Sequence, residues 1–159
     1  MAAPSHPLVT TIANLLQSAA SASPPWPTVL ARVASHFACP VATIHLLAAD
    51  GQLHLAAQQG LPPPVLDKVR VIPVGKGMAG IAAERREPVQ VCNLQSDASG
   101  VVRPGAKLTQ MEGSLAAPML DGTRLAGVFG VAKPVPYDFT ADEQALLLAV
   151  GAAIARTVR

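Results

Sequence analysis

Residues 69–91 read VRVIPVGKGMAGIAAERREPVQV, and this stretch decides the fold. An apolar run leads into the glycine-rich turn Gly75-Lys76-Gly77, and a short helical segment follows until Pro88 ends it. A second extended run begins after this proline. Glycine allows the backbone conformations that a tight helix entry requires. The order strand, turn, helix and strand therefore predicts one wall of a small-molecule pocket.

The same glycines match a second, different pattern. Gly75, Gly77 and Gly80 fit the Gly-x-Gly-x-x-Gly motif of dinucleotide-binding domains, and Asp97 lies near the distance expected for the ribose-binding acid. That fold requires a parallel strand–helix–strand unit of about thirty residues. Here the helical segment is short and antiparallel hairpins flank it. We therefore favour a structural role for the glycines, while free amides at this helix N-terminus can still hold an anionic ligand group.

Two Asp-Gly pairs predict β-hairpins on either side of the glycine turn, because this dipeptide favours the backbone angles of tight hairpin turns. The predicted strands are 41–48 and 52–58 around Asp50-Gly51, and 113–120 and 124–132 around Asp121-Gly122. The second pair is apolar nearly throughout, so we expect it to lie centrally in the sheet. Residues 93–110 form a long predicted loop with at most one short helical piece, and such loops are usually functional or mobile.

Three helices near the chain termini are predicted from apolar residues at three-to-four spacing. They span 8–20, 27–38 and 141–157, and we take the whole chain, 1–159, as one domain. The last helix begins with the capping-box pattern Thr140-x-x-Glu143, in which each side chain bonds the other residue's backbone amide. It is apolar on more than one face. We expect one face to cover the sheet and another to contact a second copy of the chain, which makes a homodimer.

The composition excludes several classes of protein. Of the 159 residues, 50% are apolar, 14% charged and 3% aromatic, and the net charge is +2. Nucleic-acid surfaces need basic clusters and stacking rings, so we expect no nucleic-acid partner. No apolar run reaches the roughly 18 residues of a membrane span, and the N-terminus lacks the basic start of a signal peptide. We therefore expect a cytoplasmic protein with no membrane contact.

The order of these elements resembles the GAF domain, a ligand-sensing relative of the PAS fold. The resemblance covers nearly the whole chain and rests on short motifs in the family's order, which are Thr43-Ile-His-Leu-Leu with Asp50-Gly51, Ala56-Ala-Gln-Gln-Gly60-Leu61, Ile72-Pro-Val-Gly75-Lys-Gly77-Met-Ala-Gly80, Glu87-Pro88-Val89 with Asn93-Leu94, Gly113-Ser-Leu-Ala-Ala-Pro118, Leu125-Ala-Gly127-Val, and Phe139-Thr-Ala-Asp-Glu143. It implies an α+β, GAF/PAS-like fold with a mostly antiparallel sheet of about six strands. The terminal helices are expected on one face.

The resemblance also implies a ligand pocket on the opposite face of the sheet, closed by loops. Position in the pattern indicates eight candidate ligand-binding residues, which are His45, Met78, Cys92, Asp97, Lys107, Met111, Ser114 and Phe129. Neither the ligand nor any cofactor is identified by the sequence.

His45 and His54 flank the first hairpin turn. If Asp50-Gly51 is a two-residue loop, His45 pairs with Ala56, and both histidines lie on one face as diagonal neighbours about 7–8 Å apart at Cα. The sequence supplies no third ligand for a metal. We therefore expect ordinary polar strand positions, from which either imidazole can donate to a ligand if this face borders the pocket.

Three branches of the family, one enzymatic and two that bind a nucleotide or a bilin, fit this chain poorly. Free methionine-R-sulfoxide reductases carry a cysteine before the last glycine of the turn and a catalytic cysteine in the loop, where this chain has Ala79 and the cysteine-free stretch 97–102. The Asn-Lys pair of cyclic-nucleotide GAF domains is absent, and no cysteine has the context of bilin attachment. Cys39 and Cys92 lack the spacing of a zinc site, and no adjacent basic residue activates Cys92.

We therefore predict a stand-alone GAF-type sensory domain of signal transduction, which binds a small molecule and acts as a homodimer. Ligand binding is expected to order residues 93–110 and to change the packing of the final helix. Two alternatives stay open at this point. One is an enzyme, a thiol-dependent reductase of a small oxidised metabolite that uses Cys92, and the other is an interaction module without a ligand.

Overall fold

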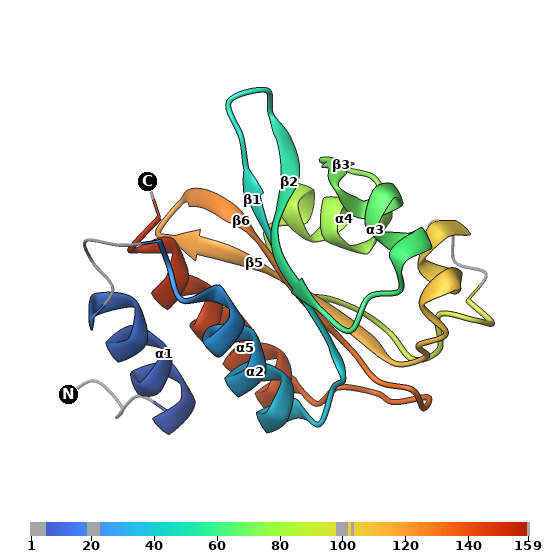
Figure 1. The fold of residues 1–159 in the computed structure, drawn as a ribbon, viewed down its shortest axis with the longest axis horizontal. Helices are drawn as coiled ribbons and strands as arrows, with labels where there is room; N and C mark the ends of the chain where they lie inside the picture. The colour runs from blue at the N-terminus through green and yellow to red at the C-terminus, as the bar shows by residue number, and fades with distance from the viewer. Residues whose placement is uncertain (1–5, 19–22, 98–101, 103, 159) are drawn as a thin grey trace.

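Six strands form an antiparallel sheet in the order β3-β2-β1-β6-β5-β4 (Figure 1). The computed structural model describes residues 6–18, 23–97, 102 and 104–158. The strands are β1 (Val41–Leu47), β2 (Gln52–Gln59), β3 (Val71–Pro73), β4 (Val89–Val91), β5 (Ser114–Asp121) and β6 (Arg124–Ala132). The helices are α1 (Pro7–Ser18), α2 (Trp26–Phe37), α3 (Pro63–Val69), α4 (Gly77–Arg85), the 3-10 helix η1 (Pro104–Thr109) and α5 (Ala141–Ala155). The predicted α+β fold with a six-stranded antiparallel sheet is confirmed.

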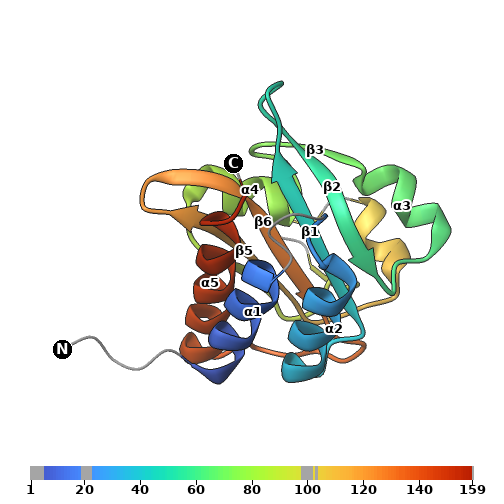
Figure 2. The same ribbon diagram turned by 60° about the vertical axis from the view of Figure 1, so that its left-hand side comes forward.

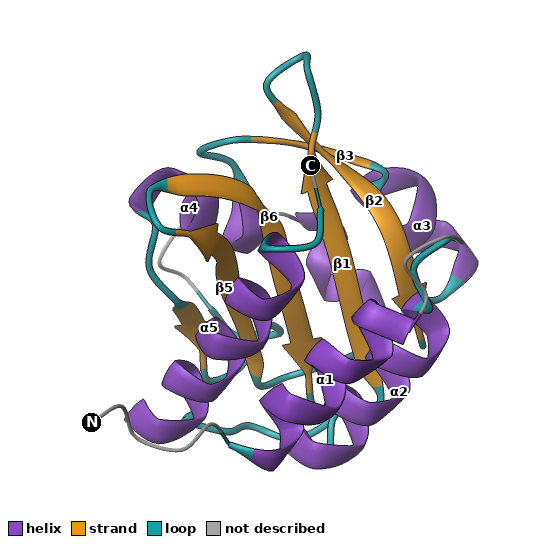
Figure 3. Cartoon of the chain, turned by 90° about the vertical axis from the view of Figure 1, so that its left-hand side faces the viewer, coloured by secondary structure: helices purple, strands orange, loops and turns teal. Residues whose placement is uncertain are grey.

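The helices lie on both faces of the sheet. The terminal helices α1, α2 and α5 cover one face, while α3, α4 and η1 lie on the other (Figures 1 and 3). This is the predicted arrangement. The helix bounds differ from the predicted ones by one or two residues, and the predicted end of the first helix, 19–20, lies outside the described residues. None of the helices in the described ranges is both long and apolar enough to cross a membrane.

The first hairpin has a three-residue loop instead of the expected two. The Ala48 amide donates to the Gln52 carbonyl at 2.9 Å, and the Gly51 amide donates to the Ala48 carbonyl at 2.9 Å. Gly51 has φ 80°. A type I turn followed by a left-handed residue is the usual form of a three-residue hairpin loop. Gly51 therefore supplies the left-handed residue at the end of a three-residue loop, whereas the prediction placed it in a two-residue loop.

This extra loop residue corrects the predicted register. His45 pairs with Leu55 rather than with Ala56, and His54 pairs with Leu46. Because successive residues of a strand point to opposite faces, a shift of one residue moves a side chain across the sheet. The prediction that both histidines share a face is therefore wrong. His45 lies on the face of α3 and α4, and His54 lies on the other.

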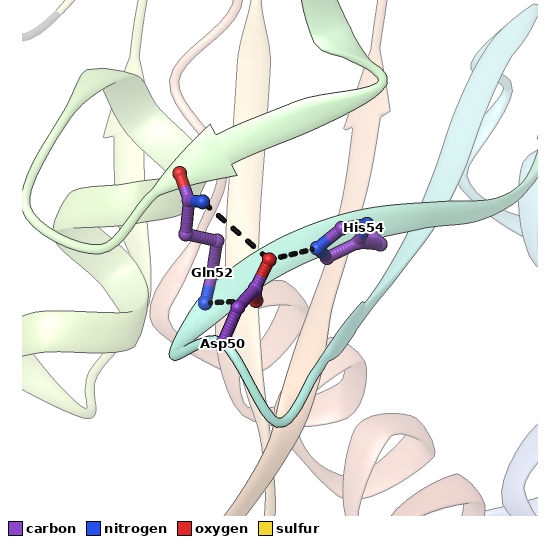
Figure 4. A network of polar contacts seen from close by, with 3 residues as sticks. All are labelled: Asp50, Gln52 and His54. Carbon is purple, nitrogen blue, oxygen red and sulfur yellow. Dashed lines mark hydrogen bonds and ion pairs between the residues drawn. The ribbon is translucent and has the colours of Figure 1, made fainter.

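His54 is bound at the exposed tip of this hairpin (Figure 4). Its Nε2 lies 2.8 Å from Oδ2 of Asp50, and the Gln52 amide donates to Oδ1 of the same carboxylate at 2.9 Å. The bond from Gln52, followed by that from His54, lowers the pKa of Asp50. Among the described residues, no group of three or more His, Cys, Asp or Glu side chains is placed to hold a metal ion.

The second hairpin supplies the middle of the sheet, as predicted. β5 and β6 pair along their length, and Asp121 pairs with Arg124, so the turn is the two-residue loop Gly122-Thr123. β6 lies between β5 and β1, and β5 lies between β6 and β4. Their side chains are mostly buried, because a helix layer covers each face.

The apolar character of α5 has an explanation within the chain. One side of α5 packs on β5 and β6, and α1 packs on another side (Figure 2). Gly151 lets α5 approach the sheet closely, since a Cβ there would lie 3.1 Å from Cα of Met119. The helix was expected to need a second copy of the chain to cover its other face. In the structure, α1 covers that face.

A buried lysine joins the helix layer to the sheet. Lys133, which follows β6, is 8% exposed, and its Nζ donates to the carbonyl of Phe37 at the C-terminal end of α2. The same nitrogen lies 4.5 Å from the centre of the Tyr137 ring and 5.8 Å from that of Phe139. A cation is favourable both at a helix C-terminus and over an aromatic face. This contact holds α2, β6 and the segment before α5 together.

The capping box of α5 is confirmed. The Glu143 amide donates to the Thr140 hydroxyl at 3.1 Å, and the Thr140 amide donates to Oε1 of Glu143 at 2.9 Å. The Tyr137 hydroxyl donates to the same carboxylate oxygen at 2.8 Å. Three donors therefore meet at the start of the helix.

Removing this cap should destabilise the protein. We expect Thr140→Ala to lower the free energy of unfolding by about 1 kcal/mol, because the Glu143 amide loses its acceptor. Thr140→Ser keeps the hydroxyl and should stay close to the native value. Urea unfolding followed by circular dichroism measures both. An equal loss in the two variants would assign the effect to the missing methyl group instead of the cap.

Candidate ligand-binding cavity

A cavity of about 440 Å³ lies between the sheet and the helices α3 and α4. Most of its lining is apolar, and it falls in the size range of small-molecule sites, roughly 300–1,000 Å³. The lining residues are Val41, Thr43, His45, Leu61, Val65, Lys68, Val69, Ile72, Lys76, Gly77, Met78, Ala79, Leu94, Val102, Thr109, Ser114, Leu115, Ala116, Gly130, Val131 and Ala132. The cavity occupies the face of the sheet on which the pocket was predicted.

The glycine turn shapes one wall of this cavity. Gly75 and Gly77 have φ values of 91° and 67°, which confirms the structural role predicted for them. The Gly75 amide donates to the Gly80 carbonyl at 2.7 Å. At Gly80, a Cβ would lie 2.3 Å from the carbonyl oxygen of Pro73, so no larger residue fits there. The turn is thus closed on itself and packed against the end of β3.

The dinucleotide-binding alternative does not agree with the sheet. That fold needs the strands before and after the glycine helix to be parallel and part of one strand–helix–strand unit. Here β3 and β4 lie at opposite edges of the sheet, and each pairs antiparallel with another strand. α4 therefore crosses the whole face between two edges.

The N-terminus of α4 opens onto the cavity. Its N-cap residue is Lys76, whose side chain makes no capping hydrogen bond, and no acidic residue lies in the first turn. The first amides of a helix have no carbonyl within the helix to bind. Those of Gly77, Met78 and Ala79 belong to residues that line the cavity. The positive end of the helix dipole therefore borders this space.

His45 presents a buried hydrogen-bond acceptor. The residue is 3% exposed, and its Nε2 lies 2.7 Å from the Val69 carbonyl oxygen. A carbonyl only accepts, so Nε2 carries the proton, and in the neutral ring Nδ1 is then an acceptor. Nδ1 has almost no accessible surface and forms no hydrogen bond to a described residue. Burial lowers the pKa of His45, partly opposed by the Val69 carbonyl, which keeps the ring neutral at pH 7.

The charged residues found in the lining are basic. Among the residues that the structure describes, Lys68 on α3 and Lys76 before α4 line the cavity, and no Asp or Glu does. Neither lysine forms an ion pair with a described residue. Both residues are exposed, so they place positive charge on the solvent side of the cavity. The lining is thus apolar inside and basic at its edge.

Three of the eight candidate residues line the cavity, namely His45, Met78 and Ser114. Phe129 does not, because it pairs with Ile44 and packs on the face of the sheet that α1, α2 and α5 cover. Cys92 is exposed and lies outside the lining.

The remaining candidates, Asp97, Lys107 and Met111, belong to the segment between β4 and β5 and do not line the cavity. The carbonyls of Lys107 and Met111 both accept hydrogen bonds from Nε2 of Gln95, at 3.1 and 2.8 Å. The predicted loop contains η1, which is its one short helical piece, and residues 98–101 and 103 of that loop lie outside the described residues.

The sequence analysis missed several lining residues. Val41 and Thr43 alternate with the core residues of β1 and share a face with His45, so strand alternation could have identified them. Lys76 lies within the glycine-rich turn but is not among the eight candidate ligand-binding residues. Lys68 lies on the short helix α3, and no local pattern in the sequence indicates the direction of its side chain.

Comparison with known proteins supports the fold. A sequence model described as the GAF domain matches residues 27–159. The GAF domain from an Acinetobacter phosphoenolpyruvate-protein phosphotransferase superposes with a TM-score of 0.72 at 22% identity, covering 97% of this chain and 93% of that one. The corresponding Coxiella burnetii domain gives 0.70 at 20% identity and coverages of 94% and 91%.

A third similar structure is an enzyme. Free methionine-R-sulfoxide reductase from Neisseria meningitidis, in complex with its substrate, superposes with a TM-score of 0.69 at 17% identity, covering 99% of this chain and 93% of that one. Identities at this level show a shared fold alone. No curated protein matches the chain in sequence.

The buried histidine predicts a pH-dependent stability. The folded-state pKa of His45 lies below the ordinary value of about 6.5, so the unfolded chain takes up the proton first as the pH falls. This contribution to stability is complete above pH 6.5 and is lost below it, with a slope of at most about 1.4 kcal/mol per pH unit. We expect His45→Gln to flatten the dependence between pH 7.5 and 5.5.

Urea unfolding at several pH values measures this slope. His36→Gln is the matched control, because it removes an exposed histidine that forms no ion pair with a described residue, and it should keep the native slope. A native slope in His45→Gln would contradict the assignment.

Proposed function

Because this chain belongs to the GAF domain family, we propose that it is a sensory module of signal transduction that binds a small molecule. The observation that carries the proposal is the cavity of about 440 Å³ between the sheet, α3 and α4. Its apolar walls, with a few polar groups facing inward, have the character of a small-molecule site. An unidentified small molecule is thus its partner.

The strand β5 lies between the cavity and α5. Ser114 and Ala116 of β5 line the cavity. The alternate residues of β5 face the terminal helices, and Met119 among them contacts Gly151 of α5. A ligand that moves β5 would therefore change the support of α5. Such a ligand can shift this equilibrium only by the difference between its affinities for the two states.

A second connection runs from the end of β4 to the start of α5. The Tyr137 amide donates to the Cys92 carbonyl at 3.0 Å, and the Phe139 amide donates to Oε1 of Gln90 at 2.8 Å. Cys92 opens the segment that leads to η1, and η1 packs on α3. A ligand that orders this segment would therefore change the position of the residues directly before the capping box of α5.

The thiol-reductase alternative has weaker support. Cys92 is exposed outside the cavity lining, so a substrate held in the cavity would not meet its thiol. Cys39 is buried, and burial raises its pKa to about 11, which keeps it protonated and unreactive. The likeness to free methionine-R-sulfoxide reductase extends to the fold, and we favour the binding module over the enzyme.

We expect protein purified from its own host to carry a ligand in this cavity. Native mass spectrometry compared with the denatured mass should show an additional bound mass. Thr43→Phe fills the cavity from β1 and should abolish this mass, whereas Thr10→Phe, on the exposed side of α1, should retain it. An apo mass for the native protein, together with no thermal stabilisation by a metabolite library, would favour an interaction module without a ligand.

We also propose a homodimer, with a smaller contact than the sequence indicated. The outward stripe of α5 that α1 leaves uncovered is Ala145, Leu148 and Ala152, which are exposed or half-buried at helical spacing. Light scattering should give twice the mass of the 16.3 kDa chain. Leu148→Glu should return it to the mass of one chain, with Thr10→Glu as the control on α1. A native monomer at millimolar concentration would dismiss the dimer.

A further inference from the structure

The floor of the cavity is built from small side chains. β5 and β6 are neighbouring strands in the middle of the sheet. Their lining residues that face away from the terminal helices are Ser114, Ala116, Gly130 and Ala132. None of these side chains is larger than a serine, so the two strands present an even surface close to the backbone. The space above this surface is the cavity.

The backbone packing does not require the glycine at the centre of this floor. Gly130 lies in regular pairing with the strands on both sides of it, and a Cβ there would lie 2.9 Å from Oγ1 of Thr43 and 3.9 Å from the Leu115 carbonyl oxygen. The closer of these contacts is with the end of a side chain, which rotation about χ1 relieves. At Gly127, by contrast, a Cβ would lie 1.9 Å from the His45 carbonyl oxygen. A glycine inside a strand weakens it and often marks a place where a ligand approaches the backbone closely.

The Thr43 hydroxyl is a polar group of the cavity without a hydrogen bond. The residue is half-buried in the lining, and no described residue bonds its side chain. The other lining hydroxyls of the described residues are engaged. That of Ser114 donates to the Val131 carbonyl at 3.3 Å. That of Thr109 accepts from the Met111 amide at 3.0 Å. A free hydroxyl both donates and accepts, so the Thr43 side chain can bind either kind of polar group on a ligand.

A charged group over this floor would have no partner. The floor residues are uncharged, and the walls around them are apolar, with Val65 on α3, Ile72 on β3 and Met78 on α4. The charged residues of the described lining, Lys68 and Lys76, are exposed on the solvent side. Burial of an ion without a paired charge costs far more than burial of a neutral polar group. The inner part of the cavity therefore favours an uncharged ligand.

We propose that the cavity binds an uncharged planar molecule, an aromatic or heteroaromatic ring system with one hydroxyl, carbonyl or N–H group, whose ring lies over Gly130 and whose polar group bonds the Thr43 hydroxyl. This inference rests on the proposed binding function and adds the chemical class and the position of the ligand. An even floor contacts a flat ring over its whole area. Met78 lines the wall of α4, and a methionine thioether makes favourable contacts with aromatic rings.

The test is a binding screen with matched compounds. One set contains a naphthol, the methylnaphthalene of the same shape, the naphthoate, and the decahydronaphthol, in which both rings are saturated. A second set built on a single ring contains phenol, toluene, benzoate and cyclohexanol. Dissociation constants are measured by ligand-observed NMR. We expect the aromatic alcohol to bind at least about tenfold more tightly than the carboxylate, whose charge is unpaired, and at least about fivefold more tightly than the thicker saturated alcohol.

Thr43→Val tests the polar contact, because it keeps the shape of the side chain and removes the hydroxyl. The ratio of the dissociation constant of methylnaphthalene to that of naphthol should fall at least about threefold in this variant. A ratio within one variant is insensitive to a general change of the cavity. Thr10→Val, on the exposed side of α1, should keep the native ratio. A native ratio in Thr43→Val would overturn the proposed contact.

Gly130→Ala tests the position of the ring. The added methyl group raises the floor and should weaken naphthol binding at least about fivefold. The Tm without ligand should not fall, because alanine is the less flexible residue in the unfolded chain. Gly127→Ala is the comparison variant and should lower the Tm, since its Cβ meets the backbone of β1. Native affinity in Gly130→Ala, or an equal loss of Tm in the two variants, would overturn the placement of the ring over Gly130.

The outcomes separate this inference from the proposed function. Carboxylates or saturated alcohols that bind as tightly as the aromatic alcohols, and whose binding Thr43→Phe abolishes, would overturn the ligand class and leave the binding function in place. Naphthol binding that survives Thr43→Phe would lie outside the cavity and overturn the inference. No binding by either set, with an additional mass on the native protein, would overturn the ligand class alone. Absence of both would overturn this inference and the proposed function together.

Discussion

The close approach of Gly80 to the Pro73 carbonyl is the contact on which the functional half of this molecule depends. It closes the turn after β3 and sends α4 across the face of the sheet to β4 at the opposite edge. Between this helix, α3 and the strands β1, β5 and β6 lies the cavity. The glycines of the turn therefore act by allowing the backbone to turn tightly between β3 and α4, and the cavity results from the position that this gives to α4.

The two faces of the sheet have different roles because of what covers them. On one face, α2 and α5 pack directly on the strands, α1 completes the layer, and the core is closed. On the other, α4 packs on part of β5 and β6, and the cavity lies beside it, between α3, α4 and the remaining parts of β1, β5 and β6. β5 contributes alternate residues to both layers. A change at the cavity can therefore be passed to α5 through this strand, which is the physical basis of the sensory role that we propose.

The polar groups of the protein show the same division. Lys133 bonds the Phe37 carbonyl and lies over the Tyr137 ring, and Thr140 and Glu143 bond each other's amides, so these groups fix the terminal helices to the sheet. At the cavity, by contrast, the start of α4 has no side-chain cap and Nδ1 of His45 has no partner. Unsatisfied groups weaken a fold, and they are best accounted for at a site that something else completes. This contrast supports the proposal that a ligand binds on the cavity face.

The sequence by itself determined most of the elements, the α+β class and the antiparallel hairpins, because periodicity, glycine and proline act locally. The side of the sheet that holds the cavity followed from the resemblance to the GAF domain. It also indicated His45, Met78 and Ser114. Only the tertiary structure decided the register of the first hairpin, in which one additional loop residue places His45 and His54 on opposite faces of the sheet. It also decided that Phe129 lies on the face covered by α1, α2 and α5. It also brought Lys68 and α4 to one cavity. Contacts of this kind join distant segments, and local patterns carry no information about them.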